Sequence, residues 1–335
     1  MTPSIRLGGF KILKGMARFA MAIPDESGQS PSLLLNAVTN KKINLPYFTC
    51  IHSGGYWGLN MLIEAAQGLK MSLIIEEVIG SSCTHTSECA VLSIFPHKKD
   101  PQIIGKLMET FSVNGIKYEG IAYSPSAISI VLEEEFINRA SEALFGPFSF
   151  SAYRTPEDWK LAQKGKEHIY KEVIASYQES RPKVYGLEYY NDHELYLINA
   201  QNKDTSTIRA LNNPDSTGRV FSFSASYPST DCSEDVLAIS LSMQENNQNA
   251  ALIINKEALY DSITGVVVFS MNGPHFGDRY GIAFDLMNSL EKNGVDILCV
   301  SCTIASITGV IRSSQLNTTL DSINQCFDVP AVIKK

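Results

Sequence analysis

The amino-acid sequence predicts an α+β fold built from a repeated β-α-β-β-α unit. The first observation is that residues 114–132 and 293–311 of the 335-residue chain align without a gap. Both segments open with Asn-Gly, continue as an apolar run, pass through a short patch rich in Ser and Thr, and end in a second apolar run. Because glycine adopts the left-handed conformation that ends many helices, each segment predicts a helix end followed by two strands and a tight connection.

The second observation is that the residues flanking these segments match as well. The pattern predicts a strand and an amphipathic helix before each segment, and another helix after it, with apolar residues at helical spacing. The predicted elements are strand 90–95, helix 102–112 and helix 136–144 around the first segment, and strand 266–271, helix 281–292 and helix 315–327 around the second. This order is that of the ferredoxin-like βαββαβ arrangement.

Weaker copies of the unit fill most of the remaining sequence. Residues 235–242 resemble residues 296–303, and a strand at 194–199, a poor helix at 219–227 and a short helix at 256–262 complete this copy. The N-terminal copy consists of strand 17–23, helix 32–39, strands 43–51 and 56–64, and helix 69–78. We therefore predict about four modules, at residues 1–82, 83–150, 183–263 and 264–335, with a linker helix at residues 151–182.

Composition and charge argue against several classes of partner. The chain carries 28 Lys and Arg against 35 Asp and Glu, a net charge of −7, whereas a protein that neutralises nucleic-acid phosphates needs a basic surplus. The apolar runs are strand-sized, well short of the ~20 residues of a membrane-spanning helix. Seven cysteines, an odd count spread over the chain, argue against a disulfide framework and for a reducing compartment. We expect a cytoplasmic protein with neither a nucleic-acid nor a membrane partner.

Motifs for metal binding and catalysis are weak. Cys83, His85 and Cys89 could begin a zinc site, but a closed site needs a fourth ligand, and the alternative is a Ser/Thr-rich connector in which Cys89 opens the next strand. The acidic run 133–135 suits the start of a helix. Gly-x-Ser-x-Gly, His-Glu-x-x-His and phosphate-loop motifs are missing from the sequence. We expect no metal, no cofactor and no catalytic residue.

At residues 263–327 the sequence resembles an ACT domain of the aspartokinase regulatory type. The resemblance is carried by Asn272-Gly273-Pro274, by Gly294-Val295-Asp296-Ile297 and by Ser306-Ile307-Thr308. It extends with fewer shared residues to 89–148. Aspartokinases have an amino-acid-kinase domain before their ACT pair, and no segment of this sequence matches one. The resemblance therefore implies a regulatory part without its kinase domain.

The resemblance also implies where a ligand would bind. ACT modules pair so that their antiparallel sheets join, and small ligands bind at the interface between two modules. The implied contacts are the loop after the first strand, with its helix N-terminus, and the start of the second strand of the neighbouring module. The candidate ligand-binding residues are Asn272, Gly273, His275, Phe276, Gly277, Asp278 and Arg279 in the loop, and Asp296, Ile297 and Ser301 on the second strand.

Several of these residues have alternative interpretations. Gly273 and Gly277 would allow a ligand to approach the backbone closely. Asp278 could bind an ammonium group, but it could equally cap the following helix. Arg279 could bind a carboxylate, but it and His275 could also be solvated loop residues. Asp296 could serve as the acidic group of the second strand or simply end a turn.

From these observations we expect a non-catalytic amino-acid sensor, resembling an aspartokinase regulatory subunit. The expected partners are a small-molecule amino acid and either a second copy of the chain, forming a homo-oligomer such as a dimer, or a metabolic enzyme. One alternative is an oligomerisation scaffold whose ACT modules no longer bind a ligand. Another is an enzyme with a site at the module interface, since catalytic residues can converge from distant positions.

Overall fold

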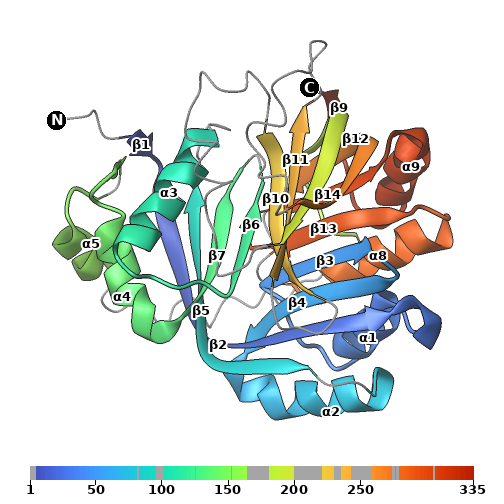
Figure 1. Ribbon diagram of the computed structural model, residues 1–335, viewed down its shortest axis with the longest axis horizontal. Coiled ribbons are helices and arrows are strands. Elements are labelled where there is room, and N and C mark those ends of the chain that lie inside the picture. The colour runs from blue at the N-terminus through green and yellow to red at the C-terminus, as the bar shows by residue number, and fades with distance from the viewer. Residues whose placement is uncertain are drawn as a thin grey trace.

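The computed structural model has an α+β architecture dominated by one large, mostly antiparallel sheet (Figure 1). The described residues are 5–80, 83–95, 101–124, 126–151, 153–163, 181–199, 221–229, 235–242, 259–273, 276, 279–304 and 306–335. Within them, no helix is both long enough and apolar enough to cross a bilayer.

We call residues 5–163 the first half of the chain and residues 181–335 the second half. The first half contains β1 (Ile5–Leu7), β2 (Gly9–Pro24), α1 (Pro31–Asn40), β3 (Tyr47–Ser53), β4 (Tyr56–Glu64), α2 (Gly68–Val78), β5 (Thr84–Phe95), α3 (Pro101–Val113), β6 (Gly120–Tyr123), β7 (Ile128–Glu133), α4 (Glu134–Ala143), β8 (Phe148–Phe150) and α5 (Pro156–Gln163). The second half contains β9 (Gly186–Asn199), β10 (Phe221–Pro228), β11 (Asp235–Ser242), β12 (Leu259–Asn272), α8 (Ile282–Lys292), β13 (Ile297–Thr303), β14 (Ile307–Arg312), α9 (Leu316–Cys326) and β15 (Val332–Lys334).

The large sheet closes on itself. Its strand order is β11-β10-β6-β7-β5-β2-β4-β3-β13-β14-β12-β9-β15, and β9 also pairs with β11 at the other end of this order. The ring therefore runs from β11 to β9, and β15 joins β9 in parallel outside it. Every strand of the ring has two neighbouring strands, although parts of β2 and β5 are paired on one side only.

The two halves are related by an internal two-fold repeat. Each half has two long strands that bend at a residue with positive φ: Gly15 in β2 and Glu88 in β5, then Asp192 in β9 and Gly265 in β12. The pairing register around these bends is conserved. Met16 pairs with Cys89 and Arg18 with Thr86 in the first half, as His193 pairs with Val266 and Leu195 with Ile263 in the second.

Two antiparallel strand pairs join the halves. In one, β3 pairs with β13, from Tyr47 opposite Thr303 to Ile51 opposite Cys299. In the other, β6 pairs with β10, with Tyr123 opposite Ser224. We call β3–β13 and β6–β10 the cross-half pairs. Since β3, β6 and β13 each follow the first helix of a β-α-β-β group, the second strands of these groups make the contact between the halves.

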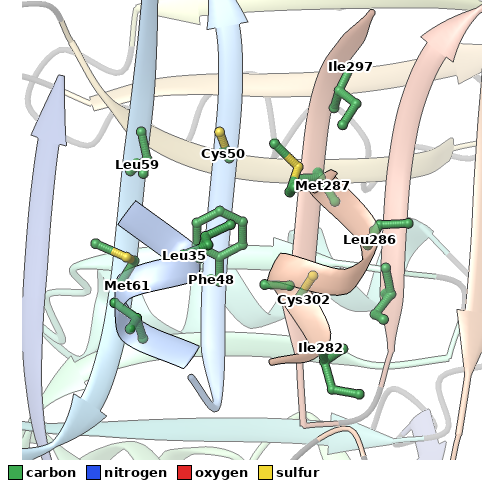
Figure 2. Close-up of a cluster of buried hydrophobic side chains, with 14 of the residues drawn as sticks. Leu35, Phe48, Cys50, Leu59, Met61, Ile282, Leu286, Met287, Ile297 and Cys302 are labelled. Atoms are coloured by element: carbon green, nitrogen blue, oxygen red, sulfur yellow. The ribbon is translucent and has the colours of Figure 1, made fainter. Parts of the chain in front are cut away.

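Apolar side chains fill both sides of the ring. One large cluster lies between β3, β4, β13 and the helices α1, α2, α8 and α9, and Figure 2 shows Leu35, Phe48, Met61, Leu286 and Cys302 within it. A second cluster packs α3, α4 and α5 against β5, β6 and β7. Two smaller clusters lie on the inner face of the ring. Helices thus cover the outer face, which is the arrangement expected of half-buried antiparallel strands.

The structure confirms the α+β class and most of the predicted helices, but two predicted helices are wrong. Residues 221–228 form strand β10, whose Phe-Ser-Phe-Ser-Ala-Ser sequence alternates with the period of a strand and is buried throughout. Strand β12 begins at Leu259, where the short helix 256–262 was expected, because β12 pairs with β9 along its first part. Residues 84–88, expected as a connector before a strand opened by Cys89, are the first part of β5.

Other expectations lie partly outside the described residues. The predicted linker helix is described only as α5, and residues 164–180 are outside the described part of the chain. Residues 200–220 and 243–258 of the third copy also lie outside it. The count of four modules and their boundaries therefore stay predictions.

Candidate ligand-binding site

The predicted loop begins where β12 ends, and its described residues are held by neighbouring segments. The carbonyl oxygen of Asn272 accepts a hydrogen bond from the Tyr185 amide at 2.9 Å. A Cβ at Gly273 would lie 2.6 Å from the Lys183 carbonyl oxygen, so only glycine fits there. Phe276 is buried and packs edge-to-face on Phe327 at 6.3 Å between ring centroids. The loop is therefore anchored to the segment before β9 and to the end of α9.

Arg279 lies at the start of α8, partly buried. Its Nη2 is 4.0 Å from Asp285 Oδ2, and the exposed fraction of the Arg279 side chain is 16%. Burial raises the pKa of Asp285, and the nearby guanidinium group opposes this rise. Gly281, with φ of 88°, forms the N-cap of α8, where a Cβ would lie 3.1 Å from Thr39 Cγ2 of α1. The N-terminus of α8 thus abuts the last turn of α1 from the other half.

A small hollow opens between these two helices. The first half contributes Leu35, Val38 and Ile43 to its lining, and the second half contributes Phe276, Ile282 and Cys302, with Arg279 as the charged group. The hollow has a volume of about 10 Å³, room for about one water molecule. It lies at the end of the β3–β13 pair where β3 begins and β13 ends, since Cys302 pairs there with Phe48.

The predicted second-strand residues lie elsewhere. Cys302 pairs with Ile307, which pairs with Met271, the residue before the loop. Ile297 pairs with Ile311 and so lies at the opposite end of β13 from the loop. Asp296 is exposed, at the end of β13 opposite the loop, and its amide donates to Gln315 Oε1 at 3.1 Å.

The other two second-strand candidates are buried. Ile297 belongs to the apolar cluster of Figure 2. Ser301 is buried, and its hydroxyl donates to the Thr308 carbonyl oxygen at 3.5 Å. The structure therefore brings together Phe276, Arg279 and the helix start, but not Asp296. His275, Gly277 and Asp278 lie outside the described residues.

A second group of polar residues lies at the other end of the β3–β13 pair. His52 Nε2 is 2.8 Å from Asp25 Oδ2, and the His52 ring stacks on Trp57 with 4.1 Å between centroids. Gln29 Nε2 donates to the carbonyl oxygens of Val78 and Ile79. Asp25 and Gln29 follow the first strand of the N-terminal copy, as the predicted loop follows β12. These residues were not among the predicted site residues, although the same template applied to that copy indicates residues 25–30.

The Cys302 thiol, which lines the hollow, is not reactive. Burial raises the pKa of the Cys302 thiol to about 12, so it stays protonated at neutral pH and is a poor nucleophile. Across the described segments, no three His, Cys, Asp or Glu side chains gather as metal ligands would. Of the three residues weighed as the start of a zinc site, His85 stacks on Phe19 with 4.6 Å between ring centroids. The site offers a guanidinium group, a helix N-terminus and an apolar surface.

A solved structure has a similar fold. Aspartate kinase from Synechocystis matches with a TM-score of 0.75 at 14% sequence identity, and the match covers 96% of this chain and 56% of that one. The regulatory subunit of aspartate kinase from Thermus thermophilus matches with 18% identity over 42% of this chain and 97% of that one, at a TM-score of 0.37.

Comparisons at the level of sequence find nothing: no family model matches this chain and no curated protein does. At 14% identity the likeness to the Synechocystis enzyme shows the fold alone. The described chain therefore shares the fold of part of an aspartate kinase, and it spans 56% of the length of that protein.

Proposed function

We propose that this chain is a non-catalytic regulatory protein of the ACT type, whose four modules bind an amino acid where the halves meet. The observation that carries the proposal is the β3–β13 pair. It joins second strands from two halves, and at its end the loop after β12, with Arg279, meets α1 and residues 43–45 of the other half. This is the geometry that the resemblance to ACT domains implies for a ligand site.

The chemistry of the hollow suits an amino acid. A carboxylate would be stabilised by the Arg279 guanidinium and by the free backbone N–H groups at the start of α8. The apolar lining, including Leu35, Val38 and Ile282, would contact the rest of the ligand. Because the hollow has room for about one water molecule, a ligand can enter only if the lining moves apart. Binding would then favour one arrangement of the halves over another, which is the requirement for a sensor.

The fold of aspartate kinase supports a metabolic enzyme, specifically a kinase of that kind, as the regulated partner. The chain would act in the cytoplasm, as its cysteine content predicts. A homo-oligomer remains compatible with this proposal. It is not needed to build the site, because the cross-half pairs supply both sides of it within one chain.

Titration of the protein with each of the twenty amino acids tests the proposal. A binding amino acid at about 100 times its Kd should raise the free energy of unfolding by about 2.7 kcal/mol, measured by urea denaturation and calorimetry. Arg279→Ala should weaken binding by about tenfold or more, since a charge-assisted hydrogen bond is lost. The matched control is Arg139→Ala on α4, where an exposed arginine donates to the Gly115 carbonyl oxygen. If no amino acid shifts stability, the sensor proposal is wrong.

The small volume of the hollow favours a second candidate, a scaffold that assembles without a ligand. In that case light scattering should detect self-association at micromolar concentration that none of the amino acids alters. Self-association that changes with one amino acid would favour the sensor instead.

A further inference from the structure

Two tight turns from different halves meet inside the molecule. The β6–β7 turn includes Ser124 and Ala127, and the β13–β14 turn includes Thr303 and Ser306. Ser306 Oγ donates a hydrogen bond to Ser124 Oγ at 2.7 Å, between residues 182 positions apart. Both side chains are buried, with exposed fractions of 1% and 2%. The turns have the same internal geometry, since Ser124 N donates to Ala127 O at 2.9 Å and Thr303 N to Ser306 O at 2.8 Å.

Further buried hydroxyl groups come from the neighbouring strands of the two turns. Ser93 and Ser129 are hydrogen-bonded at 2.8 Å in the first half, as Ser270 and Thr308 are at 3.1 Å in the second. We call these four residues, together with Ser124, Thr303 and Ser306, the hydroxyl cluster. Losing a buried hydrogen bond costs free energy, so these groups resist separation.

The hydroxyl cluster lies at the end of both cross-half pairs. Thr303 pairs with Tyr47 in β3–β13, and it follows Cys302, which lines the hollow. Tyr123 pairs with Ser224 in β6–β10, and it precedes Ser124. Chain neighbours and hydrogen bonds together therefore connect Cys302 at the hollow, through Ser306 and Ser124, to β10, which lies in the other cross-half pair.

We propose that the Ser124–Ser306 hydrogen bond couples the two cross-half pairs, so that a change at the hollow alters the β6–β10 pair. If β13 shifts, Ser306 must either move Ser124 with it or give up the buried bond between the two turns. Ser124 Oγ would then keep only its contacts within its own turn, such as those to Ala127, and Ser306 Oγ its contact with Thr303 Oγ1. In the cell the change would be ligand binding, and to that extent the inference rests on the proposed function. Coupling of this kind is reciprocal, so a change at β6–β10 would alter the hollow equally.

A ligand-free experiment tests the coupling. Phe276→Ala disturbs the hollow, and amide hydrogen exchange is then measured in residues 221–228, with α4 as the reference for global unfolding. Relative to α4, exchange in 221–228 should become about fivefold faster or more. In a Ser306→Ala background the same substitution should change that ratio little. In a Ser289→Ala background, which removes a buried bond to the Ser322 carbonyl oxygen between α8 and α9, the full effect should remain.

Two outcomes would overturn the inference. One is that Phe276→Ala leaves the ratio unchanged, and the other is that Ser306→Ala leaves the effect of Phe276→Ala intact. Ser124→Ala serves as the second variant if Ser306→Ala does not fold, and Arg279→Ala as the second way to disturb the hollow. Since no ligand is present, failure here leaves amino-acid binding untouched. If instead no amino acid binds, a positive result of the hydrogen-exchange experiment would still show that the two cross-half pairs are coupled.

Discussion

The two halves of the ring use different chemistry at the same three positions. In the first half, Arg18 Nε donates to Asn60 Oδ1 at 3.0 Å, Arg18 Nη1 lies 3.5 Å from Glu119 Oε2, and Asn60 Nδ2 donates to the Glu119 carbonyl oxygen at 3.2 Å. Arg18 and Asn60 are buried. In the second half the equivalent residues all belong to one apolar cluster, and they are Leu195, Ala238 and Leu298.

The equivalence follows from strand pairing and from the sequence repeat. Arg18 and Leu195 each lie three residues after the bend of their strand. Asn60 and Ala238 are placed by the matching pairs Ala20–Asn60 and Leu197–Ala238. Glu119 and Leu298 correspond in the gapless repeat. The fold thus accepts either solution, provided that each polar group finds its partners inside the same network.

A second pair of positions differs in volume. Leu92 pairs with Ile130 between β5 and β7, and the equivalent pair between β12 and β14 is Phe269 and Gly309. A Cβ at Gly309 would lie 2.4 Å from Phe269 Cζ, so the glycine makes room for the ring. The first half therefore pairs two side chains of medium size, whereas the second half pairs a phenylalanine ring with a glycine, which has no side chain. This is how close packing is preserved when the individual residues change.

The largest expected effect comes from breaking the polar network. Arg18→Ala leaves the Glu119 carboxylate and the Asn60 amide without their shared partner. We expect a loss of about 3 kcal/mol, near the low end for a buried pair because the Glu119 side chain keeps 24% exposure. Urea denaturation measures the loss. The control is Lys106→Ala, which removes an exposed ion pair with Glu109 and should cost under about 0.5 kcal/mol. Equal effects would mean that the network contributes no more than a surface pair.

A smaller loss is expected from overpacking the second half. Gly309→Ala forces a methyl group into the Phe269 ring and should destabilise the fold by about 2 kcal/mol. Phe269→Leu introduces the residue type that the first half has at this position. Added to Gly309→Ala, it should recover part of the lost stability, measured by thermal denaturation. If the double variant is no more stable than Gly309→Ala alone, the smaller side chain at 269 does not compensate for the larger one at 309.

The buried thiol of the second half predicts a pH dependence. Burial raises the pKa of Cys302 in the folded protein to about 12, from an ordinary value near 9.0. Its contribution to stability is therefore complete below about pH 9 and is lost as the pH rises toward 12, because only the unfolded chain ionises.

Cys302→Ala should accordingly reduce the alkaline loss of stability by about 1.4 kcal/mol per pH unit above pH 9. The comparison is made by urea denaturation of wild type and variant at several pH values. Cys83→Ala, at a partly exposed thiol, should show a smaller difference. A difference between wild type and Cys302→Ala that stays constant with pH would contradict the assignment.

The smallest effect is expected from exchanging the whole network. The triple variant Arg18→Leu, Asn60→Ala and Glu119→Leu gives the first half the residues of the second. Its free energy of unfolding should lie within about 1 kcal/mol of the wild type, because an apolar set can replace a buried polar set that is removed as a whole. A loss close to that of Arg18→Ala would show that the two solutions are not interchangeable.

The sequence predicted local structure better than it predicted pairing. Helices such as α1 and α8 were recognised because their apolar spacing is a local signal. The long strands β2 and β5 were predicted too short, since positive φ at Gly15 and Glu88 bends a strand without ending it. The closed ring could not be predicted, because periodicity reveals which residues face a core but not which strands lie side by side.

The candidate site was predicted in part for the same reason. The loop carrying Phe276 and Arg279 is local to one copy of the repeat, and the sequence identified it. Ile43 and Leu45, which face it, come from the other half, and no pattern in the sequence connects them. Asp296 was predicted as the acidic group that the second strand offers to the loop of a neighbouring module. It lies at the start of β13, the end of the β3–β13 pair at which β3 runs on to His52, and that role stays a prediction.

Both cross-half pairs take one strand from each half, and this bears on how such a molecule could have evolved. Each half supplies one strand to β3–β13 and one to β6–β10, and neither pair lies within a half. Two separate polypeptides, each of half this length, could therefore close the same ring around a true symmetry axis. Gene duplication followed by fusion would turn that symmetric assembly into a single chain, after which the two copies were free to diverge.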